Sequence, residues 1–256
     1  MTTPRPTTKV EDYREVLQLP HQDHLIIVGG QAVSIWADRY LQAEPELHQY
    51  LPFTSKDLDL LGDAVDLHHL SKATGFKRVM APQKVLIPSA GFIEMPRHNA
   101  APVRIEILKR IYGVTTQEAK ATALVVERNG VHYRVLHPLM LLKAKAENSA
   151  DLPQDQPGQE RQDVRHLKMV ILCVRGFLRE LIMQVENNTL AARDCINLLE
   201  ETLAIATSRA AIDTKKKFGV AWDMVLPLGS LQSASNPKLK NFFGKRLPKL
   251  LDQIKE

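Results

Sequence analysis

The chain has 256 residues, of which 44% are hydrophobic and 25% charged, with a formal net charge of +5. This composition excludes a disordered or low-complexity chain, and the length suffices for one large domain or two small ones. The longest apolar stretches are far shorter than the roughly 20 residues that a membrane span needs, and Met1–Lys9 lacks an apolar signal-peptide core. We therefore expect a cytoplasmic protein without a membrane partner.

Apolar runs, alternating runs and glycine or proline breaks predict an α/β pattern up to Leu136. In chain order, the pattern predicts a strand over Leu25–Val28 that ends at Gly29 and Gly30, a helix over Gln31–Leu41, a polar loop over 42–55, a strand over Lys56–Leu61, a helix over Asp66–Thr74, a hairpin of Val85–Ile87 with Phe92–Met95, and a strand over Val103–Leu108.

The pattern becomes helical after Leu136. Pro138 suits the first position of a helix over Leu139–Asn148. Further helices are predicted over Glu160–Val185 and Thr189–Ser208, and Asn236-Pro237 opens the last one. The sequence therefore predicts an α+β fold with two domains, a mixed sheet with flanking helices over residues 1–136 and a helical domain over residues 137–256.

Charge and cysteine usage bear on the partners. Residues 1–207 carry 24 Lys and Arg against 25 Asp and Glu, whereas residues 208–256 carry 10 against 4. A basic C-terminal segment can attract polyanions such as RNA, although solvated surface lysines are equally common. Cys173 and Cys195 are too few for a disulfide framework or a zinc cluster, so we expect reduced, buried thiols.

Two acids stand out in the strand predicted over Lys56–Leu61. Side chains two apart on a strand share a face, so Asp57 and Asp59 project together while Leu58 and Leu60 point to the other face. Such a carboxylate pair suits Mg²⁺, which proteins hold with one or two carboxylates and substrate phosphates. A solvated strand edge is the simpler reading of an isolated Asp-x-Asp.

Glu106 and the glycine pair extend this site. If the strand over Val103–Leu108 pairs beside the Asp57–Asp59 strand, Glu106 brings a third carboxylate that could help to bind divalent ions for phosphoryl transfer. An ion pair of Glu106 with Arg104 or Lys109 is the alternative. Gly29 and Gly30 precede a helix and could bring backbone N–H groups to a phosphate.

This ordered set of motifs resembles the DNA polymerase β-like nucleotidyltransferase superfamily, and most closely the bacterial AbiEii-like family of abortive-infection and toxin–antitoxin nucleotidyltransferases. The resemblance covers roughly Leu25–Leu181 and places a lysine and an aspartate of the helical half at Lys143 and Asp163. It implies that Asp57, Asp59 and Glu106 hold the metal, that Gly29, Gly30 and Lys143 bind the nucleotide, and that Asp163 assists catalysis.

The resemblance also implies an activity. The expected reaction transfers an NMP from an NTP to an acceptor hydroxyl, with Mg²⁺ or Mn²⁺ as cofactor and pyrophosphate as product. RNA such as a tRNA 3′ end is the favoured acceptor, and an antitoxin is the expected protein partner. The alternative is a non-catalytic binding module on this fold in a toxin–antitoxin or defence system. Two departures from the family pattern favour this alternative. Glu106 occupies the position of the third acid, where Asp is the commoner residue in the family, and the loop before Asp57 is longer than usual.

The helix predicted over Glu160–Val185 carries two stripes. Asp163 falls at the edge of an apolar stripe, where it is either an N-terminal dipole partner or a group that faces a cleft. A separate basic stripe is either a solvated face or a track for a nucleic-acid backbone. Its members are Arg161, Arg165, Lys168, Arg175 and Arg179.

Overall fold

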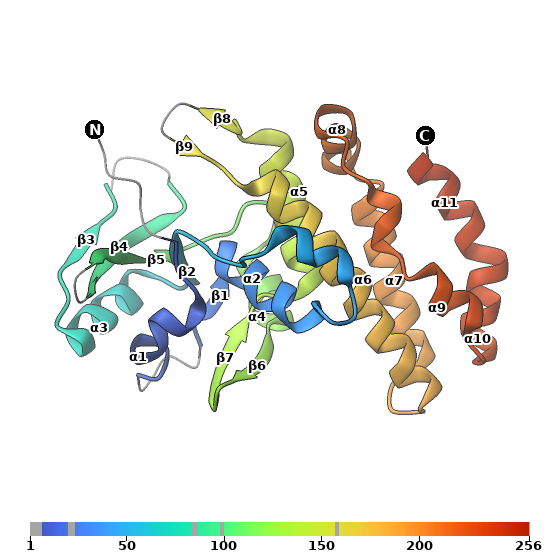
Figure 1. The fold of residues 1–256 in the computed structure, drawn as a ribbon, viewed down its shortest axis with the longest axis horizontal. Coiled ribbons are helices and arrows are strands. Elements are labelled where there is room, and N and C mark those ends of the chain that lie inside the picture. The colour runs from blue at the N-terminus through green and yellow to red at the C-terminus, as the bar shows by residue number, and fades with distance from the viewer. Residues whose placement is uncertain (1–6, 20–23, 83–86, 98–99, 157–158, 256) are drawn as a thin grey trace. The chain divides into compact units, whose positions relative to one another are not determined.

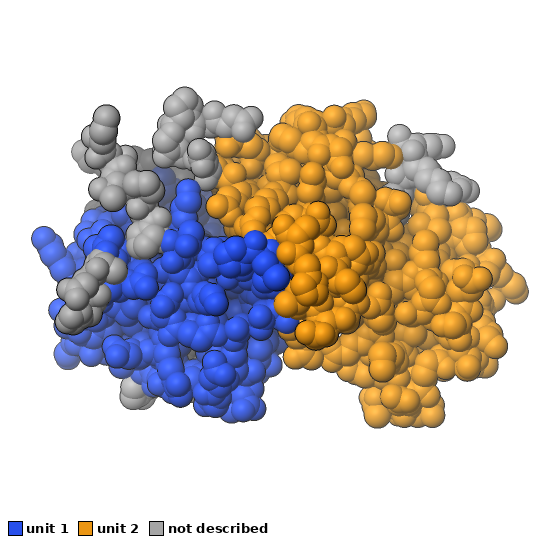
Figure 2. Space-filling model, viewed as in Figure 1, with its two compact units in different colours: residues 1–38, 51–141 blue, residues 39–50, 142–256 orange. Residues whose placement is uncertain are grey.

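The computed structural model describes residues 7–19, 24–82, 87–97, 100–156 and 159–255. The chain divides by its contacts into two compact units (Figure 2). Unit 1 comprises residues 1–38 and 51–141, and unit 2 comprises residues 39–50 and 142–256. The sequence predicts a single boundary between residues 136 and 137, whereas the contacts also place the segment 39–50 with the helices of unit 2.

Unit 1 contains a seven-stranded mixed sheet in the order β3-β4-β5-β2-β1-β7-β6 (Figure 1). Strands β2 and β5 are parallel, as are β1 and β7, and the other neighbouring strands are antiparallel. The elements of this unit are η1 (Val10–Tyr13), α1 (Arg14–Leu17), β1 (Ile26–Val28), α2 (Gly29–Tyr40, ending in unit 2), β2 (Asp57–Leu61), α3 (Ala64–Thr74), β3 (Arg78–Met80), β4 (Ser89–Arg97), β5 (Ala100–Leu108), α4 (Thr116–Thr122), β6 (Leu124–Arg128) and β7 (Val131–Val135).

Unit 2 is helical apart from one short hairpin. Its long helices α6 and α7 lie side by side, and α7 also contacts α8 (Figure 1). The elements are η2 (Pro45–Tyr50), α5 (Pro138–Asp151, beginning in unit 1), β8 (Asp155–Gln156), β9 (Gln159–Glu160), α6 (Asp163–Glu186), α7 (Ala192–Ala206), α8 (Arg209–Phe218), η3 (Trp222–Val225), α9 (Leu228–Ser233), α10 (Pro237–Asn241), η4 (Phe242–Arg246) and α11 (Leu247–Lys255). The predicted α+β class is confirmed.

The central strands of the sheet have one apolar face. Leu58 on β2 is the register partner of Ile105 on β5, which in turn faces Ile93 on β4, and all three side chains are fully buried. Burial of each such side chain contributes roughly 1.5–3 kcal/mol to folding. Because side chains alternate along a strand, the polar residues between them project together from the opposite face.

Local sequence signals explain several element boundaries. Asp63 caps α3 by accepting hydrogen bonds from the backbone N–H groups of Val65 and Asp66, so this helix begins at Ala64, before the predicted start at Asp66. Pro138 is the first residue of α5, as predicted. The helix α5 continues to Asp151, whereas α6 begins at Asp163 and not at Glu160.

The strand β4 includes Phe92–Met95, the second strand of the predicted hairpin. The segment 83–86, which includes most of the strand predicted over Val85–Ile87, lies outside the described residues. In the described part of the chain, β4 pairs with β3 on one side and with β5 on the other. The helix α3 packs against β3, β4 and β5 (Figure 1).

Among the described residues, every helix is too short or too polar to cross a membrane.

Candidate active site

The carboxylates predicted from sequence meet on the polar face of the sheet. Asp59 on β2 is the register partner of Glu106 on β5, and neighbouring strands lie about 4.8 Å apart. Asp57 shares this face, with Arg104 as its register partner. All four residues are half-buried. The strand pairing that the predicted site requires is therefore present, while the roles of Asp57, Asp59 and Glu106 stay predictions.

Glu106 does not form the ion pair that the sequence allows. Neither Arg104 nor Lys109 makes an ion pair or a hydrogen bond with it, and within the described ranges no other residue does. The Arg104 guanidinium instead lies over the ring of Phe92, with its central carbon 3.7 Å from the ring centroid. A half-buried carboxylate without a partner among the described residues is open to a substrate hydroxyl or a cation.

The start of α2 lies directly against Asp59. Val28 on β1 is the register partner of Asp59, and the next residue, Gly29, has a φ of +63°. A Cβ atom on Gly29 would lie 2.0 Å from Asp59 Oδ2, so only glycine leaves space for this carboxylate. The first N–H groups of a helix lack helical partners and carry partial positive charge, which favours anions there. The structure thus explains Gly29 by its contact with Asp59, and phosphate binding by Gly29 and Gly30 stays a prediction.

Tyr13, which the sequence argument missed, belongs to the surroundings of the acid pair. Its side chain is fully buried, and its hydroxyl lies 2.9 Å from Thr8 Oγ1. Burial raises the pKa of Tyr13 to about 12, and the charges of Asp57 and Asp59 act in the same direction. The phenol therefore stays neutral beside the carboxylates. No spacing pattern in the sequence links this residue to the strand that carries them.

Hydrogen bonds hold the N-terminal segment next to the start of β2. Thr8 forms an antiparallel bridge with Ser55, in which the Thr8 N–H donates to the Ser55 carbonyl at 2.7 Å. The buried Gln31 side chain, at the beginning of α2, donates to the carbonyl and hydroxyl oxygens of Thr8. These contacts link the segment before η1 to α2 and to the residues just before β2, and α2 and β2 both carry predicted site residues.

The donor set of this face suits a hard divalent cation. Carboxylate oxygens are the ligands that Mg²⁺ prefers, and proteins commonly supply one or two of them while substrate phosphates supply others. The sequence predicts a set of three, Asp57, Asp59 and Glu106. In the described part of the chain, no three His, Cys, Asp or Glu side chains are arranged to hold a metal ion. Asp57, Asp59 and Glu106 therefore do not form a ready-made three-ligand site among the described residues, and their role as metal ligands stays a prediction.

Lys143 and Asp163 lie in unit 2, and Asp163 has a different lysine as its partner. Lys145 Nζ lies 2.8 Å from Asp163 Oδ1, and Arg161 Nε lies 2.7 Å from Oδ2. Burial tends to raise the pKa of Asp163, but Lys145 and Arg161 hold it below its usual value. Because both oxygens are engaged, Asp163 is a weak proton acceptor. Lys143, the predicted phosphate ligand, is half-buried on α5.

Lys145 is the residue of unit 2 that sequence reasoning missed. It stands two positions after Lys143, which on a helix places the two side chains on different faces. Its side chain is 8% exposed, and that of Asp163 is 5% exposed. The available signal was a lysine between Ala144 and Ala146 in an apolar helix, because a buried charge requires a partner of opposite sign.

The predicted basic stripe of α6 is not a free face. Arg175 Nε donates to the buried Glu44 at 2.7 Å, and Arg175 also pairs with Glu46. Arg179 pairs with Glu44 at 3.0 Å and donates to the Ala43 carbonyl. Arg165 donates to the carbonyl of Tyr50. These three arginines hold the segment 39–50 within unit 2, so for them the expectation of a solvated face or a nucleic-acid track is wrong.

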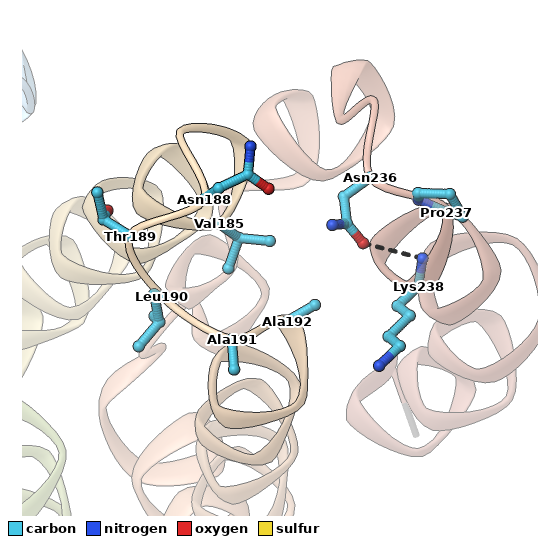
Figure 3. Close-up of a pocket in the computed structure, with 9 residues that line it drawn as sticks. All are labelled: Val185, Asn188, Thr189, Leu190, Ala191, Ala192, Asn236, Pro237 and Lys238. Carbon is cyan, nitrogen blue, oxygen red and sulfur yellow. Dashed lines mark hydrogen bonds between the residues drawn. The ribbon is translucent and has the colours of Figure 1, made fainter.

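A hollow of about 570 Å³ in unit 2 lies between the turn after α6 and the start of α10 (Figure 3). Lys238 is the one charged side chain among the residues drawn there, and its backbone N–H donates to Asn236 Oδ1 at 3.0 Å. The lining holds no carboxylate, histidine or cysteine. Lys238 and Thr189 are therefore its only side chains with an amine or a hydroxyl group, and no carboxylate or imidazole stands beside them in the lining.

Comparisons with known proteins add little to these observations. No protein-family model matches the chain, and no curated protein matches it. A solved structure described as an antigenic nucleotidyltransferase-like protein from Paracoccidioides brasiliensis is similar over 66% of this chain and 78% of that chain, with a TM-score of 0.43 and 15% identity. Similarity at this level is too low to assign a function, so the functional case rests on the residues of the polar sheet face.

Proposed function

We propose that the protein is a metal-dependent nucleotidyltransferase that moves an NMP from an NTP to an acceptor hydroxyl and releases pyrophosphate. The observation that carries this proposal is the register pairing of Asp59 with Glu106 on a half-buried sheet face beside the glycine start of α2. The motif resemblance to AbiEii-like members of the DNA polymerase β-like superfamily supports the same activity and belongs to the proposal.

The chain's own residues divide the work in this proposal. Glu106 accepts the proton of the acceptor hydroxyl. At the same time, the oxygen of that hydroxyl forms a bond to the α-phosphorus of the NTP. The bond from that phosphorus to the bridging oxygen of the β-phosphate breaks, and pyrophosphate leaves. Backbone N–H groups at Gly29 and Gly30 bind phosphate oxygens next to Asp59. A carboxylate within hydrogen-bond reach of the proton is a competent general base.

Asp57 and Asp59 are the proposed ligands of Mg²⁺ or Mn²⁺, with Glu106 as the third acid. When bound, such an ion lowers the repulsion between the carboxylates and the triphosphate and stabilises charge on the transferred group. The role of the three side chains is to present oxygen atoms on one face of two adjacent strands.

Unit 2 supplies the remaining proposed groups. Lys143 is proposed to bind the triphosphate. Asp163 is proposed to fix Lys145 through their buried ion pair and not to act as a base, since Lys145 and Arg161 lower its pKa. The ion pair fixes the position of the Lys145 ammonium group on α5, two residues after Lys143.

The proposed acceptor is RNA, such as a tRNA 3′ end. The C-terminal segment carries exposed basic side chains that support a polyanionic partner. The exposed members are Arg209, Lys215, Lys216, Lys217, Lys238, Lys240, Lys245, Arg246 and Lys249. Phosphate contacts make affinity fall steeply with salt, so tRNA binding should weaken by orders of magnitude between roughly 50 and 200 mM salt. Salt-independent binding would contradict an RNA acceptor. An antitoxin partner and a cytoplasmic location remain parts of the same proposal.

The activity is tested by incubating the whole protein with each labelled NTP, Mg²⁺ and a tRNA pool. We expect label on the RNA with one or more NTPs, and at least a hundredfold loss of transfer in Asp59→Asn. Glu127→Gln is the matched control, because Glu127 is an exposed carboxylate on β6. Transfer that survives Asp59→Asn would overturn the assignment. Metal-dependent nucleotide binding without transfer to RNA, protein or small-molecule acceptors would support the non-catalytic module instead.

A further inference from the structure

Arg104 is a cation in the middle of the acidic sheet face. It lies on β5, two residues before Glu106, and its side chain shares the face of Glu106. Its register partners are Asp57 on β2 and Glu94 on β4. Despite these acidic neighbours, Arg104 makes no ion pair or hydrogen bond within the described part of the chain.

The Arg104 guanidinium is held by stacking. Its central carbon lies 3.7 Å from the centroid of the Phe92 ring, and Phe92 is the register partner of Glu106 on β4. A guanidinium stacked on an aromatic ring keeps its plane fixed while its N–H groups point outward in that plane. The stack therefore orients the donors of Arg104 next to the carboxylate that the proposed function uses.

One donor of this guanidinium is buried without an acceptor. Arg104 Nε has almost no exposed surface and no hydrogen-bond partner among the described residues. Buried polar groups in proteins are nearly always satisfied, and the exceptions commonly mark a site that a water or a ligand completes. The two terminal nitrogens are not buried in this way, so a phosphate can approach the guanidinium through them and form the charge-assisted contact typical of arginine.

We propose that Arg104, backed by Phe92, binds a phosphate group of the substrate; this inference rests on the proposed function. A polyphosphate that approaches Asp57, Asp59 and Glu106 is repelled by the negative charge of all three side chains. Arg104 is a cation on the same strand as Glu106 and offsets this repulsion where the anion must lie. The phosphate belongs either to the NTP or to the acceptor, and the chemistry of recognition is the same.

The test measures binding to the whole protein by calorimetry at low salt. The probes are ATP with Mg²⁺, inorganic tripolyphosphate, adenosine and a short single-stranded RNA. In Arg104→Met we expect at least tenfold weaker binding of ATP and tripolyphosphate, with unchanged adenosine binding, if the phosphate is that of the nucleotide. Weakening confined to the RNA would assign the phosphate to the acceptor. Unchanged affinity for every phosphate-bearing probe would overturn the inference.

Two further variants separate binding from structure. Arg104→Lys keeps the charge but not the planar fork, so it should recover only part of the affinity. Phe92→Leu removes the stacking face and should weaken the same probes, less than Arg104→Met does. Arg104→Met removes a buried donor without an acceptor, so its melting temperature should equal or exceed that of the wild type. A lowered melting temperature with unchanged binding would show a purely structural residue and contradict the inference.

Asp59→Asn distinguishes failure of this inference from failure of the proposed function. If the wild type transfers nucleotide, Asp59→Asn does not, and Arg104→Met binds every probe like the wild type, only the Arg104 inference fails. If the wild type binds neither ATP nor tripolyphosphate and transfers no label, the proposed function fails and the inference fails with it.

Discussion

The two units differ in how their charged side chains are paired. The buried charges of unit 2 have ion-pair partners, whereas two half-buried charges on the sheet face of unit 1 have none among the described residues. In unit 2, Glu44 lies between Arg175 and Arg179, and Lys145 pairs with Asp163. On the sheet face, Glu106 and Arg104 have no such partner within the described ranges. Paired buried charges fix the position of chain segments, whereas charges that the fold leaves without partners are available to a substrate.

The largest expected effect concerns the paired charges. Glu44→Ala leaves Arg175 and Arg179 without their buried partner, whose side chain is 1% exposed. Breaking a buried ion pair in this way costs about 3–5 kcal/mol of unfolding free energy. Urea unfolding, followed by the fluorescence of Trp222 in a Trp36→Phe background, reports on unit 2.

The matched control is Glu46→Ala, because Glu46 also pairs with Arg175 but its side chain is 43% exposed. Exposed ion pairs contribute at most about 1 kcal/mol. Equal losses in Glu44→Ala and Glu46→Ala would mean that burial of the pair does not hold the segment 39–50.

The next effect concerns the contact between Gly29 and Asp59. Gly29→Ala adds a Cβ atom 2.0 Å from Asp59 Oδ2 at a position with φ of +63°. Gly75 has a similar φ of +71° but nothing within 4 Å of an added Cβ, so Gly75→Ala measures the backbone cost alone, about 1 kcal/mol. Gly29→Ala should cost about 1–3 kcal/mol more, because it also forces atoms apart. Urea unfolding in a Trp222→Phe background reports on unit 1.

A double variant identifies the source of this difference. Asp59→Ala removes the carboxylate and leaves only the Cβ atom, 3.1 Å from a Cβ added at Gly29, so most of the excess cost of Gly29→Ala over Gly75→Ala should disappear in that background. If Gly29→Ala and Gly75→Ala cost the same in the wild-type background, the close approach of Asp59 to the start of α2 would be contradicted.

A smaller effect is expected from pH. Burial, with a contribution from Lys145, lowers the pKa of His166 to about 3, against about 6.5 in the unfolded chain. Between pH 6.5 and pH 3, His166 is therefore protonated in the unfolded state but neutral in the folded state. The free energy of unfolding falls as the pH is lowered through this range. Linkage gives a loss of about 2 kcal/mol at pH 5 from this residue.

His166→Gln should reduce this pH dependence, and His132→Gln is the control at an exposed histidine, because His132 is 66% exposed. Denaturant unfolding at pH 7 and pH 5 gives the comparison. A wild-type slope that His166→Gln does not alter would contradict a neutral, buried imidazole.

The sheet-face acids could be predicted because their signal is local. Alternation in Lys56–Leu61 and Val103–Leu108 assigns Asp57, Asp59 and Glu106 to polar faces. The pairing of β2 with β5 then brings Asp59 beside Glu106. Pro138 likewise marked the start of α5 through its fixed φ and missing N–H.

The contacts that the sequence argument missed join segments far apart in the chain. The pairing of Glu44 with Arg175 spans 131 positions, and no helical or strand period relates them. The stack of Arg104 on Phe92 depends on the register of β4 with β5. Periodicity gives the face on which a side chain lies but not the residue that it meets across the fold.

The most direct test of the central claim is Mg²⁺-dependent ATP binding, measured by calorimetry on the wild type, Glu106→Gln and Glu127→Gln. Glu106 has no partner within the described part of the chain, so Glu106→Gln should fold with unchanged stability. We expect Mg²⁺ to raise the affinity for ATP in the wild type and in Glu127→Gln. In Glu106→Gln, the factor by which Mg²⁺ raises this affinity should be at least tenfold smaller. Identical Mg²⁺-dependent binding in all three proteins would contradict Glu106 as the third acid of a nucleotide site on this sheet face.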